Sequence, residues 1–164
     1  MKKILVMVFS LAVLMYSEKT WASEIRIIDA DTIELNGLKV RLNGIDAPEM
    51  AQKCQDMNTK MYLCGISSRD ALKSLIQKMP DRMVQCEYMG EDAYGRLIRE
   101  CALGKININM WLVENGWALA YRKYSKKYVL NENSAKINRI GIWNGKFVEP
   151  WNWRRGKRLY SEIN

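Results

Sequence analysis

The order of hydrophobic and polar residues predicts one small α+β domain. Five segments have the short apolar runs that are typical of strands, at residues 25–28, 32–35, 38–42, 83–88 and 97–103. Three segments are expected to be helices, at residues 70–79, 107–114 and 133–139. Five short strands with a helix between the third and the fourth is the order of an OB-type barrel, whose open face binds nucleic acid. Another small α+β domain is the alternative.

Asn36 and Gly37 predict a tight turn between the second and third strands. A two-residue loop fixes how the strands pair, so Thr32 is expected opposite Arg41. Arg41 then lies on the face away from the core, close to Asp31. The other face, which we expect to be the core, carries Ile33, Leu35, Leu38, Val40 and Leu42.

The first expected helix has signals at both ends. Ser67 or Ser68 can cap its N-terminus, and Pro80 ends it. The apolar spacing i, i+3, i+4, i+7, which is typical of an amphipathic helix, is found at Leu72, Leu75, Ile76 and Met79.

Residues 1–22 have the three-part layout of a secretory signal peptide. Two lysines precede an apolar run over residues 4–16, which is shorter than the roughly 20 residues that a membrane-spanning helix needs. The small residues Thr20 and Ala22 permit cleavage after Ala22. We therefore expect an exported protein, periplasmic or secreted, whose residues 23–164 form a single domain with no membrane anchor. A buried N-terminal helix and an uncleaved anchor are the alternatives.

The composition narrows the chemistry. The 164 residues include 26 Lys and Arg, 18 Asp and Glu and no histidine, for a formal charge of +8. The lack of histidine excludes a Ser-His-Asp triad and any His-containing zinc or haem site. Residues 121–164 hold 11 basic and 3 acidic residues, so the positive excess of the exported part lies there. This basic end is either a solvated surface or one that attracts a polyanion.

Four cysteines, an even number in an exported chain, predict two disulfides. Cys86 and Cys101 lie on strand-like segments on either side of a turn region, so a hairpin would bring them together. Cys54 and Cys64 close a stretch that we expect to be a polar surface loop. Of the three possible pairings we therefore expect Cys54–Cys64 and Cys86–Cys101.

Carboxylates gather near the ends of the first strands. Asp29 and Asp31 precede the second strand, Asp46 follows the third, and Glu49 comes three residues later. Two or three of them at one end of a barrel would form an oxygen site suited to Ca²⁺ or Mg²⁺. The simpler interpretation of Asp29 and Asp31 is a turn in which their side chains accept hydrogen bonds from backbone N–H groups. Without a cation the carboxylates repel one another unless an arginine such as Arg41 offsets their charge.

Four ordered segments carry a more specific pattern: IIDADTIEL, VRLNGIDAPE, AYGR and NGWALAY, followed by a basic, Trp-containing end. Together they resemble the staphylococcal thermonuclease family over residues 25–153. The resemblance implies a five-stranded OB-type barrel with about three helices that cleaves DNA and RNA with Ca²⁺. It implies that the metal is held by Asp31, Asp46 and the backbone carbonyl of Ala47. It also implies that Glu49 acts through water and that Arg41 and Arg96 hold the scissile phosphate.

These residue types suit phosphodiester hydrolysis. A phosphodiester is anionic, and a cation with two arginines can neutralise it and favour the five-coordinate transition state. Arginine suits this role because its planar fork binds two phosphate oxygens and stays charged. Tyr94 and Tyr121 are candidates for stacking or hydrogen bonding with nucleic acid, with ordinary packing as the alternative.

Two positions depart from the family pattern. Ala30 stands where a glycine is usual, and if that position needs positive φ, alanine there costs about 1 kcal/mol. Ala93 stands where the staphylococcal enzyme has a lysine, so one phosphate contact is missing. Neither departure replaces a metal ligand or a catalytic arginine.

The sequence therefore predicts an exported, Ca²⁺-dependent nuclease with DNA and RNA as substrates and no protein partner implied. We interpret the basic C-terminal end as an approach surface for nucleic acid, separate from the acidic pocket. A non-catalytic OB-type nucleic-acid-binding protein is the alternative, which loss of Glu49 or of either arginine would favour. A phosphatase with Asp29 as nucleophile is disfavoured, because that motif wants Thr or Val where Ile33 stands and a helix where the hairpin lies.

Overall fold

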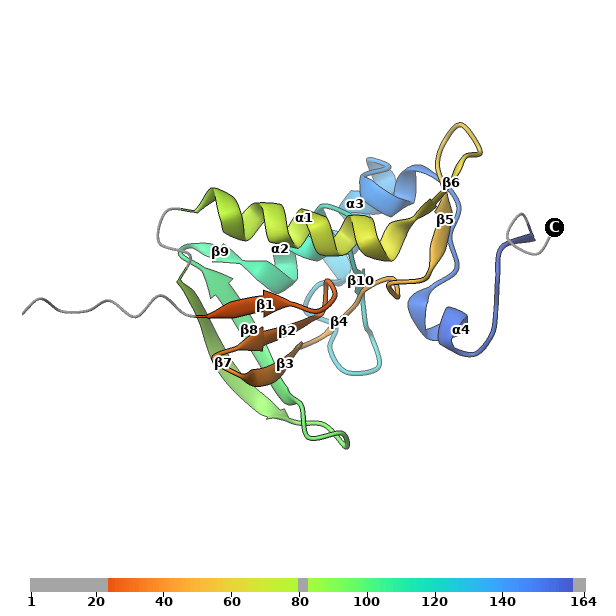
Figure 1. Cartoon of the computed structure of the whole chain (residues 1–164). Coiled ribbons are helices and arrows are strands. Elements are labelled where there is room, and N and C mark those ends of the chain that lie inside the picture. Colours follow the sequence, from red (N-terminus) through yellow and green to blue (C-terminus); the bar gives the residue numbers. More distant parts are fainter. Residues whose placement is uncertain (1–23, 80–82, 161–164) are drawn as a thin grey trace, which may run out of the picture.

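The computed structural model of the protein describes residues 24–79 and 83–160, so the signal peptide expected over residues 1–22 lies outside the described residues. The main sheet has the strand order β1-β2-β3-β8-β7, with β9 paired to β8. These strands are β1 (Ile25–Ile27), β2 (Thr32–Leu35), β3 (Leu38–Leu42), β7 (Val84–Glu91), β8 (Leu97–Leu103) and β9 (Ile106–Asn107). The sheet curls into a half-barrel, and α1 (Cys64–Lys78) lies across it (Figure 1). The expected OB-type α+β fold is confirmed.

Shorter elements complete the fold. Strand β4 (Ile45–Asp46) pairs with β10 (Leu119–Ala120), and β5 (Lys53–Gln55) pairs with β6 (Met61–Leu63). The remaining helices are α2 (Ile108–Glu114), α3 (Val129–Ile137), the 3-10 helix η1 (Gly141–Asn144) and α4 (Pro150–Arg154). None of the helices in the described ranges has the length and apolar character that crossing a membrane requires.

The β2–β3 hairpin has the register that its two-residue turn predicts. Thr32 pairs with Arg41, and Asn36 and Gly37 take the positive φ values, 49° and 79°, that this turn needs. The predicted core face is wrong at one position, because Leu38 beside the turn is 56% exposed. Leu38 lies beside the exposed turn and its partner Leu35 is only partly buried, so burial along this face decreases from Ile33 and Val40 toward the turn.

A parallel pairing inside the main sheet joins distant parts of the chain. Strand β3 pairs with β8, with Val40 opposite Leu97 and Arg41 opposite Ile98. Strand β8 also pairs with β7 in an antiparallel hairpin that places Cys86 directly opposite Cys101, and the two form a disulfide. The loop of this hairpin, residues 92–96, is thereby carried to the same end of the sheet as Arg41.

Helix α1 starts earlier than its sequence suggests. It begins at Cys64, directly after β6, and its N-cap is Leu63, so neither Ser67 nor Ser68 caps it. Ser68 is fully buried inside the helix. The predicted end agrees with a helix that stops at Lys78, although Pro80 itself lies outside the described residues.

The segment between Cys54 and Cys64 is a β-hairpin with an exposed, mostly polar tip at residues 57–60 and with buried cysteines at its base. The two cysteines form the second disulfide, and both are fully buried. They pack with Leu119 and Ile142 in a second, smaller hydrophobic core. The stretch looked polar because its tip is exposed, whereas the disulfide at its base joins β5 to the start of α1.

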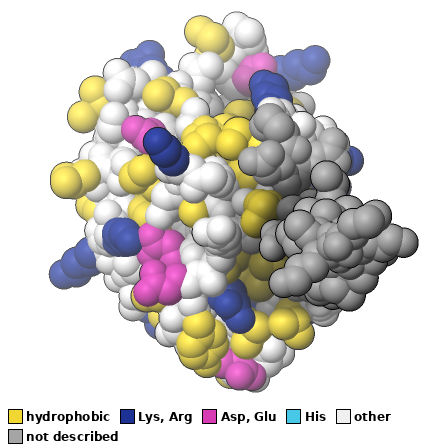
Figure 2. Space-filling model, turned by 90° about the vertical axis from the view of Figure 1, so that its left-hand side faces the viewer, with side chains coloured by type: hydrophobic (Ala, Val, Ile, Leu, Met, Phe, Trp, Pro, Cys, Tyr) yellow, Lys and Arg dark blue, Asp and Glu magenta, His cyan; other side chains and the backbone are white. Residues whose placement is uncertain are grey.

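The face at the N-terminal end of β1 carries no broad basic patch. In Figure 2 the Lys and Arg side chains on this face are separated from one another, and acidic side chains lie between some of them. Helix α4, with the C-terminal arginines, lies at the opposite end of the molecule (Figure 1). This arrangement agrees with the charge distribution along the sequence.

Candidate active site

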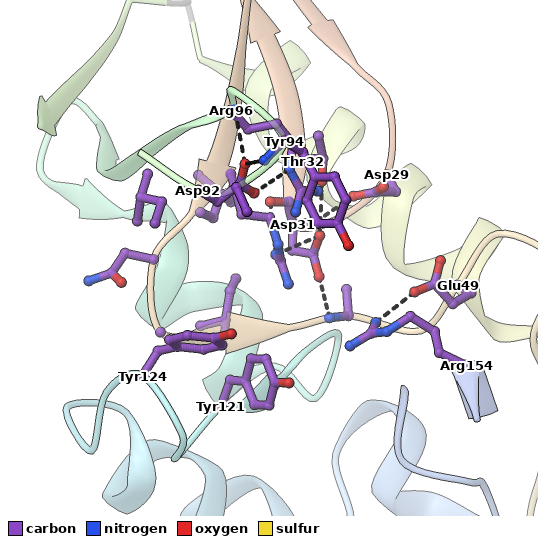
Figure 3. A pocket seen from close by; sticks show the side chains of 18 of the residues that line it. Asp29, Asp31, Thr32, Glu49, Asp92, Tyr94, Arg96, Tyr121, Tyr124 and Arg154 are labelled. Atoms are coloured by element: carbon purple, nitrogen blue, oxygen red, sulfur yellow. Dashed lines mark hydrogen bonds and ion pairs between the residues drawn. The ribbon is translucent and has the colours of Figure 1, made fainter. Parts of the chain in front are cut away.

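A pocket of about 580 Å³ opens at the end of the barrel where β2 begins and β3 ends (Figure 3). Its walls come from six separate parts of the chain: the turn before β2, the end of β3, the segment after β4, the β7–β8 loop, the segment after β10 and the end of α4. Among its lining residues are Asp31, Arg41, Glu49, Arg96 and Arg154.

Asp31 is held at the pocket by the turn before β2. Its Oδ2 accepts a hydrogen bond from the backbone N of Ala47 (2.6 Å), and its Oδ1 accepts one from Thr32 Oγ1 (3.1 Å). The backbone N of Asp31 donates to Asp29 Oδ1 (3.0 Å), which is the turn contact that the simpler sequence interpretation predicts. Burial and the neighbouring charge of Asp31 raise the pKa of Asp29 to about 7. Asp29 therefore shapes the turn, and both aspartates line the pocket.

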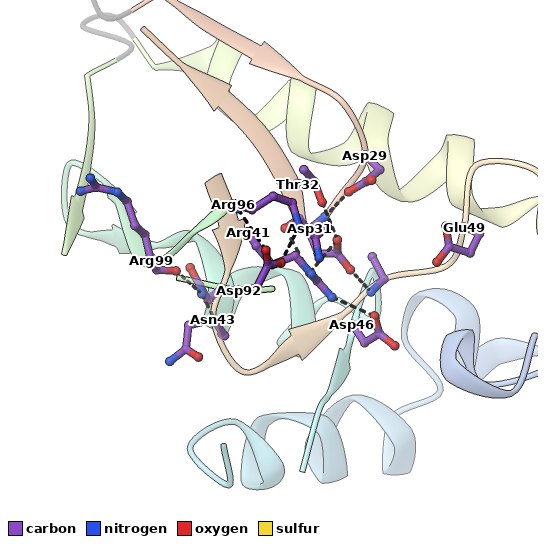
Figure 4. Close-up of polar contacts among 12 residues, drawn as sticks. Asp29, Asp31, Thr32, Arg41, Asn43, Asp46, Glu49, Asp92, Arg96 and Arg99 are labelled. Carbon is purple, nitrogen blue, oxygen red and sulfur yellow. Dashed lines mark hydrogen bonds and ion pairs between the residues drawn. The ribbon is translucent and has the colours of Figure 1, made fainter. Parts of the chain in front are cut away.

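Arg41 links the two carboxylates that the resemblance places on the metal. Its Nη1 lies 2.6 Å from Asp31 Oδ1, and its Nη2 lies 2.9 Å from Asp46 Oδ1 (Figure 4). Nη1 also donates to the backbone carbonyl of Asp31 (3.1 Å). Burial by itself lowers the pKa of Arg41, but the charges of Asp31 and Asp46 outweigh it and raise the pKa. The proximity predicted from the hairpin register is thus present.

Asp46 is the most deeply buried carboxylate of the site. Strand β4 places it opposite Leu119 of β10, and its side chain is 0% exposed. Burial raises the pKa of Asp46 above its ordinary value, although Arg154 and Arg41 both favour the charged form. Because burial destabilises the ionised carboxylate, additional positive charge beside Asp46 would stabilise it.

The carboxylates do not form a tight three-membered cluster. Within residues 24–79 and 83–160 no group of three or more acidic or cysteine side chains is arranged to hold a metal ion. Asp31 and Asp46 meet through Arg41, whereas Glu49 lies apart from them (Figure 4). The structure therefore brings together the predicted pair, and the third carboxylate is held elsewhere.

Arg154 holds Glu49, and sequence reasoning did not identify it as a site residue. From the end of α4, its Nη1 reaches Glu49 Oε1 (2.7 Å) and its Nη2 reaches Asp46 Oδ2 (2.7 Å). Burial lowers the pKa of Arg154, but hydrogen bonds to Asp46 and Glu49 outweigh it and raise the pKa. No motif marks this arginine among its basic neighbours, because the contact spans more than a hundred residues of sequence. The sequence interpretation, in which the basic end is separate from the acidic pocket, is therefore wrong at Arg154.

Arg96 is positioned by the loop between β7 and β8. Asp92 Oδ1 accepts hydrogen bonds from the backbone N of Tyr94 (2.9 Å) and of Arg96 (3.0 Å), and Asp92 Oδ2 accepts one from Arg96 Nε (2.7 Å). Gly95 takes φ of +74°, which lets the loop close around this carboxylate. Burial raises the pKa of Asp92, but these hydrogen bonds outweigh it, so the pKa is lowered. Sequence reasoning singled out Arg96 but missed Asp92, which orients it.

The rings of Tyr94 and Tyr121 differ in how much of their surface is available to a nucleic-acid base. Tyr94 is 85% exposed, and the Arg96 guanidinium lies 5.7 Å from its ring centre. The Tyr121 ring lines the pocket but stacks on Trp151, with ring centres 5.4 Å apart and planes 1° from parallel. Tyr124, which sequence reasoning did not name, packs edge-on against Tyr121 and also lines the pocket (Figure 3). Stacking of a base on Tyr121 is therefore limited to the face that Trp151 leaves open.

The two departures from the family pattern have different structural consequences. Ala30 is fully buried and does not have positive φ, so the strain considered for alanine there is absent. Ala93 lines the pocket between Asp92 and Tyr94, so this wall carries no lysine.

Comparison with known proteins adds an independent finding. Residues 39–145 match a family model described as staphylococcal nuclease homologue. The succinoglycan biosynthesis protein ExoI of Rhizobium meliloti is 41% identical over 120 residues, which cover 71% of this chain and 61% of that protein. An uncharacterized endonuclease of Escherichia coli is 34% identical over 141 residues, 81% of this chain and 84% of that protein. A micrococcal nuclease of Shigella flexneri is 31% identical over 173 residues, with 89% of each chain covered.

Proposed function

Because the chain belongs to the family of staphylococcal nuclease homologues, we propose that it is an exported, Ca²⁺-dependent nuclease that hydrolyses phosphodiester bonds of DNA and RNA. The observation that carries the proposal is the pairing of β3 with β8, which brings Arg41 and Arg96 to one pocket lined also by Asp31 and Glu49. Two guanidinium groups beside oxygen ligands are what an anionic phosphodiester needs.

The donor atoms of the pocket fit a hard cation. Asp31 and Asp46 are both buried and offer only oxygen, and a carboxylate has about four acceptor positions. Asp31 pairs with Arg41, accepts hydrogen bonds from Thr32 and Ala47, and is also contacted by the Asp29 carboxyl, whose negative charge a cation would offset. A Ca²⁺ ion held by Asp31, Asp46 and the carbonyl of Ala47 would supply positive charge to the phosphate and lower the pKa of bound water.

The two arginines differ in their readiness to bind phosphate. Arg96 uses its Nε and backbone N for Asp92, and within the described residues no hydrogen bond is made by its two terminal nitrogens. They are free to donate to two phosphate oxygens. Arg41 uses both of its terminal nitrogens for Asp31 and Asp46, so it acts first by holding these carboxylates and by its charge. Glu49 then orients the attacking water or accepts its proton.

Export rests on the disulfides. Two cystines are stable in an oxidising compartment and rare in the cytosol. Together with the expected signal peptide they support a periplasmic or secreted protein. A non-catalytic nucleic-acid-binding protein is disfavoured, because binding alone requires neither Glu49 in the pocket nor the buried aspartates.

Digestion of single-stranded DNA and of RNA by residues 23–164, with Ca²⁺ and with a chelator, tests the proposal. We expect cleavage with Ca²⁺ only, and a loss on the order of 10²- to 10⁵-fold in kcat for Arg96→Ala and for Glu49→Gln. Full activity of either variant would contradict the site assignment. A wild-type protein that binds but does not cut nucleic acid at millimolar Ca²⁺ would favour the binding protein.

A further inference from the structure

The end of α4 enters the candidate active site through Arg154. Its planar fork binds both oxygens of Asp46, with Nη2 to Oδ2 at 2.7 Å and Nη1 to Oδ1 at 3.1 Å. The same Nη1 donates to Glu49 Oε1 at 2.7 Å. Arg154 therefore crosslinks a buried carboxylate proposed to bind metal to the carboxylate proposed to activate water. Figure 3 shows its contact with Glu49. It lies outside residues 39–145, the segment that matches the family model.

The segment that carries Arg154 is itself fastened to the site. Trp151 stacks on Tyr121, which follows β10. Gln52 is fully buried, and its Nε2 donates to the carbonyl of Val148 (2.6 Å) while its Oε1 accepts from the backbone N of Glu49 (3.2 Å). An exposed ion pair contributes little, because two flexible side chains must be ordered. Here α4 is already held in place, so less conformational entropy is lost when the guanidinium binds.

The contact leaves room for a cation. Asp46 accepts one hydrogen bond from Arg41 and two from Arg154, so one of its roughly four acceptor positions remains, on Oδ2. Arg154 does not have to leave Asp46 before an ion binds. This argues for a positioning role in the loaded site and against a plug that metal must displace.

Glu49 depends on this one contact. Its side chain is about one-third exposed, it lies in the segment between β4 and β5, and among the described residues Arg154 is the single side-chain partner of its carboxylate. We propose that Arg154 is a positioning residue that fixes the Glu49 carboxylate for its reaction with water, an inference that rests on the proposed nuclease function. Without Arg154, Glu49 samples several rotamers and spends less time beside the attacking water.

The test compares Arg154→Ala with Arg154→Lys and with Lys73→Ala. Lys73 is an exposed residue of α1, outside the basic C-terminal end, so its loss removes one positive charge without touching the site. We expect Arg154→Ala to lower kcat by about 10- to 100-fold with KM within about twofold, because Arg154 orients Glu49 and does not bind substrate. Lysine keeps the charge but loses the fork, so Arg154→Lys should recover only part of kcat. Lys73→Ala should keep the wild-type kcat.

A double-mutant cycle identifies the residue through which Arg154 acts. In a Glu49→Gln background, Arg154→Ala should lower kcat by less than about threefold, because the group that Arg154 positions is already lost. Additive losses would overturn the inference and indicate a direct contact with phosphate. Ca²⁺ affinity, measured by calorimetry on the same variants, should change by less than about tenfold, because Asp46 keeps a free acceptor position while Arg154 is bound.

Other outcomes are equally decisive. A rise in activity or a large rise in Ca²⁺ affinity for Arg154→Ala would overturn the inference and identify Arg154 as a plug. Thermal unfolding in chelator shows whether each variant is folded, and Arg154→Lys keeps the test valid if the alanine variant is not. A wild type that does not cleave refutes the proposed function, whereas a cleaving wild type matched by a folded Arg154→Ala variant refutes this inference alone.

Discussion

A single methyl group added at Gly65 should move the active site. Gly65 lies in the first turn of α1, and its Cα faces the backbone of the Glu49 segment. A Cβ placed there would lie 1.9 Å from the carbonyl oxygen of Glu49 and 2.9 Å from Cα of Met50. The neighbouring atoms are backbone, so no side chain can rotate away. The start of the helix therefore fixes the position of Glu49.

The size of the effect follows from that distance. Close carbon–oxygen contacts are about 3.3 Å, so α1 and the Glu49 segment must separate by more than about 1 Å. Overpacking of this kind destabilises by about 1–3 kcal/mol, whereas the better helix propensity of alanine returns up to about 1 kcal/mol. We expect a net loss of about 1–2 kcal/mol, a fall in Tm of about 3–8 °C, and a loss of about 10²-fold in kcat.

Thermal unfolding and nucleic-acid digestion by Gly65→Ala check both expectations. Ser67→Ala is the matched control, because it places alanine in the same turn without adding an atom and loses only the hydrogen bond from Ser67 Oγ to the carbonyl of Leu63. A Gly65→Ala variant with a higher Tm and wild-type kcat would show that α1 does not fix the Glu49 segment.

Three further predictions concern other parts of the molecule. Asp92→Asn should lower kcat by about 10- to 100-fold, because it releases Arg96. The folded-state pKa of Asp92 is lowered, so the stabilisation that its carboxylate provides is present above about pH 4 and is lost below it. The Tm values of the wild type and the variant should therefore differ at pH 7 and converge near pH 3. Replacing Cys54 and Cys64 by serine opens a loop of sequence separation 10 and should cost about 3 kcal/mol or more in urea unfolding, because serine hydroxyls are also buried without partners. Protein recovered from the periplasm or medium should begin just after Ala22 by N-terminal sequencing, and an intact N-terminus would contradict export by signal cleavage.

Local features of the fold were predictable. The turn at Asn36 and Gly37 fixed the register of β2 and β3, and with it the approach of Arg41 to Asp31, because both are set by residues close in sequence. The disulfide between Cys86 and Cys101 followed in the same way from one hairpin. Comparison with known proteins confirms the family and the enzyme class to which the motifs pointed.

Features that join distant segments were not predictable. Nothing local to β3 or β8 indicates that they pair in parallel, and nothing in the basic C-terminal end distinguishes Arg154 from Arg155. The start of α1 was missed because the chain passes into the helix directly from β6, where packing and the buried disulfide replace a side-chain cap. In each case contacts between distant segments determine the structure, and local sequence propensity does not.

The pairing of β3 with β8 has a consequence for folding. Residues 40 and 97 must meet before Arg41 and Arg96 can line one pocket, so a long stretch of chain has to close first. Arg154 adds a third, still more distant element. Assembly of the active site should therefore coincide with the slow, non-local step of folding. Under the export proposed above, a chain that has not yet folded would carry no assembled site, so cellular nucleic acid would not meet a working nuclease before the chain folds.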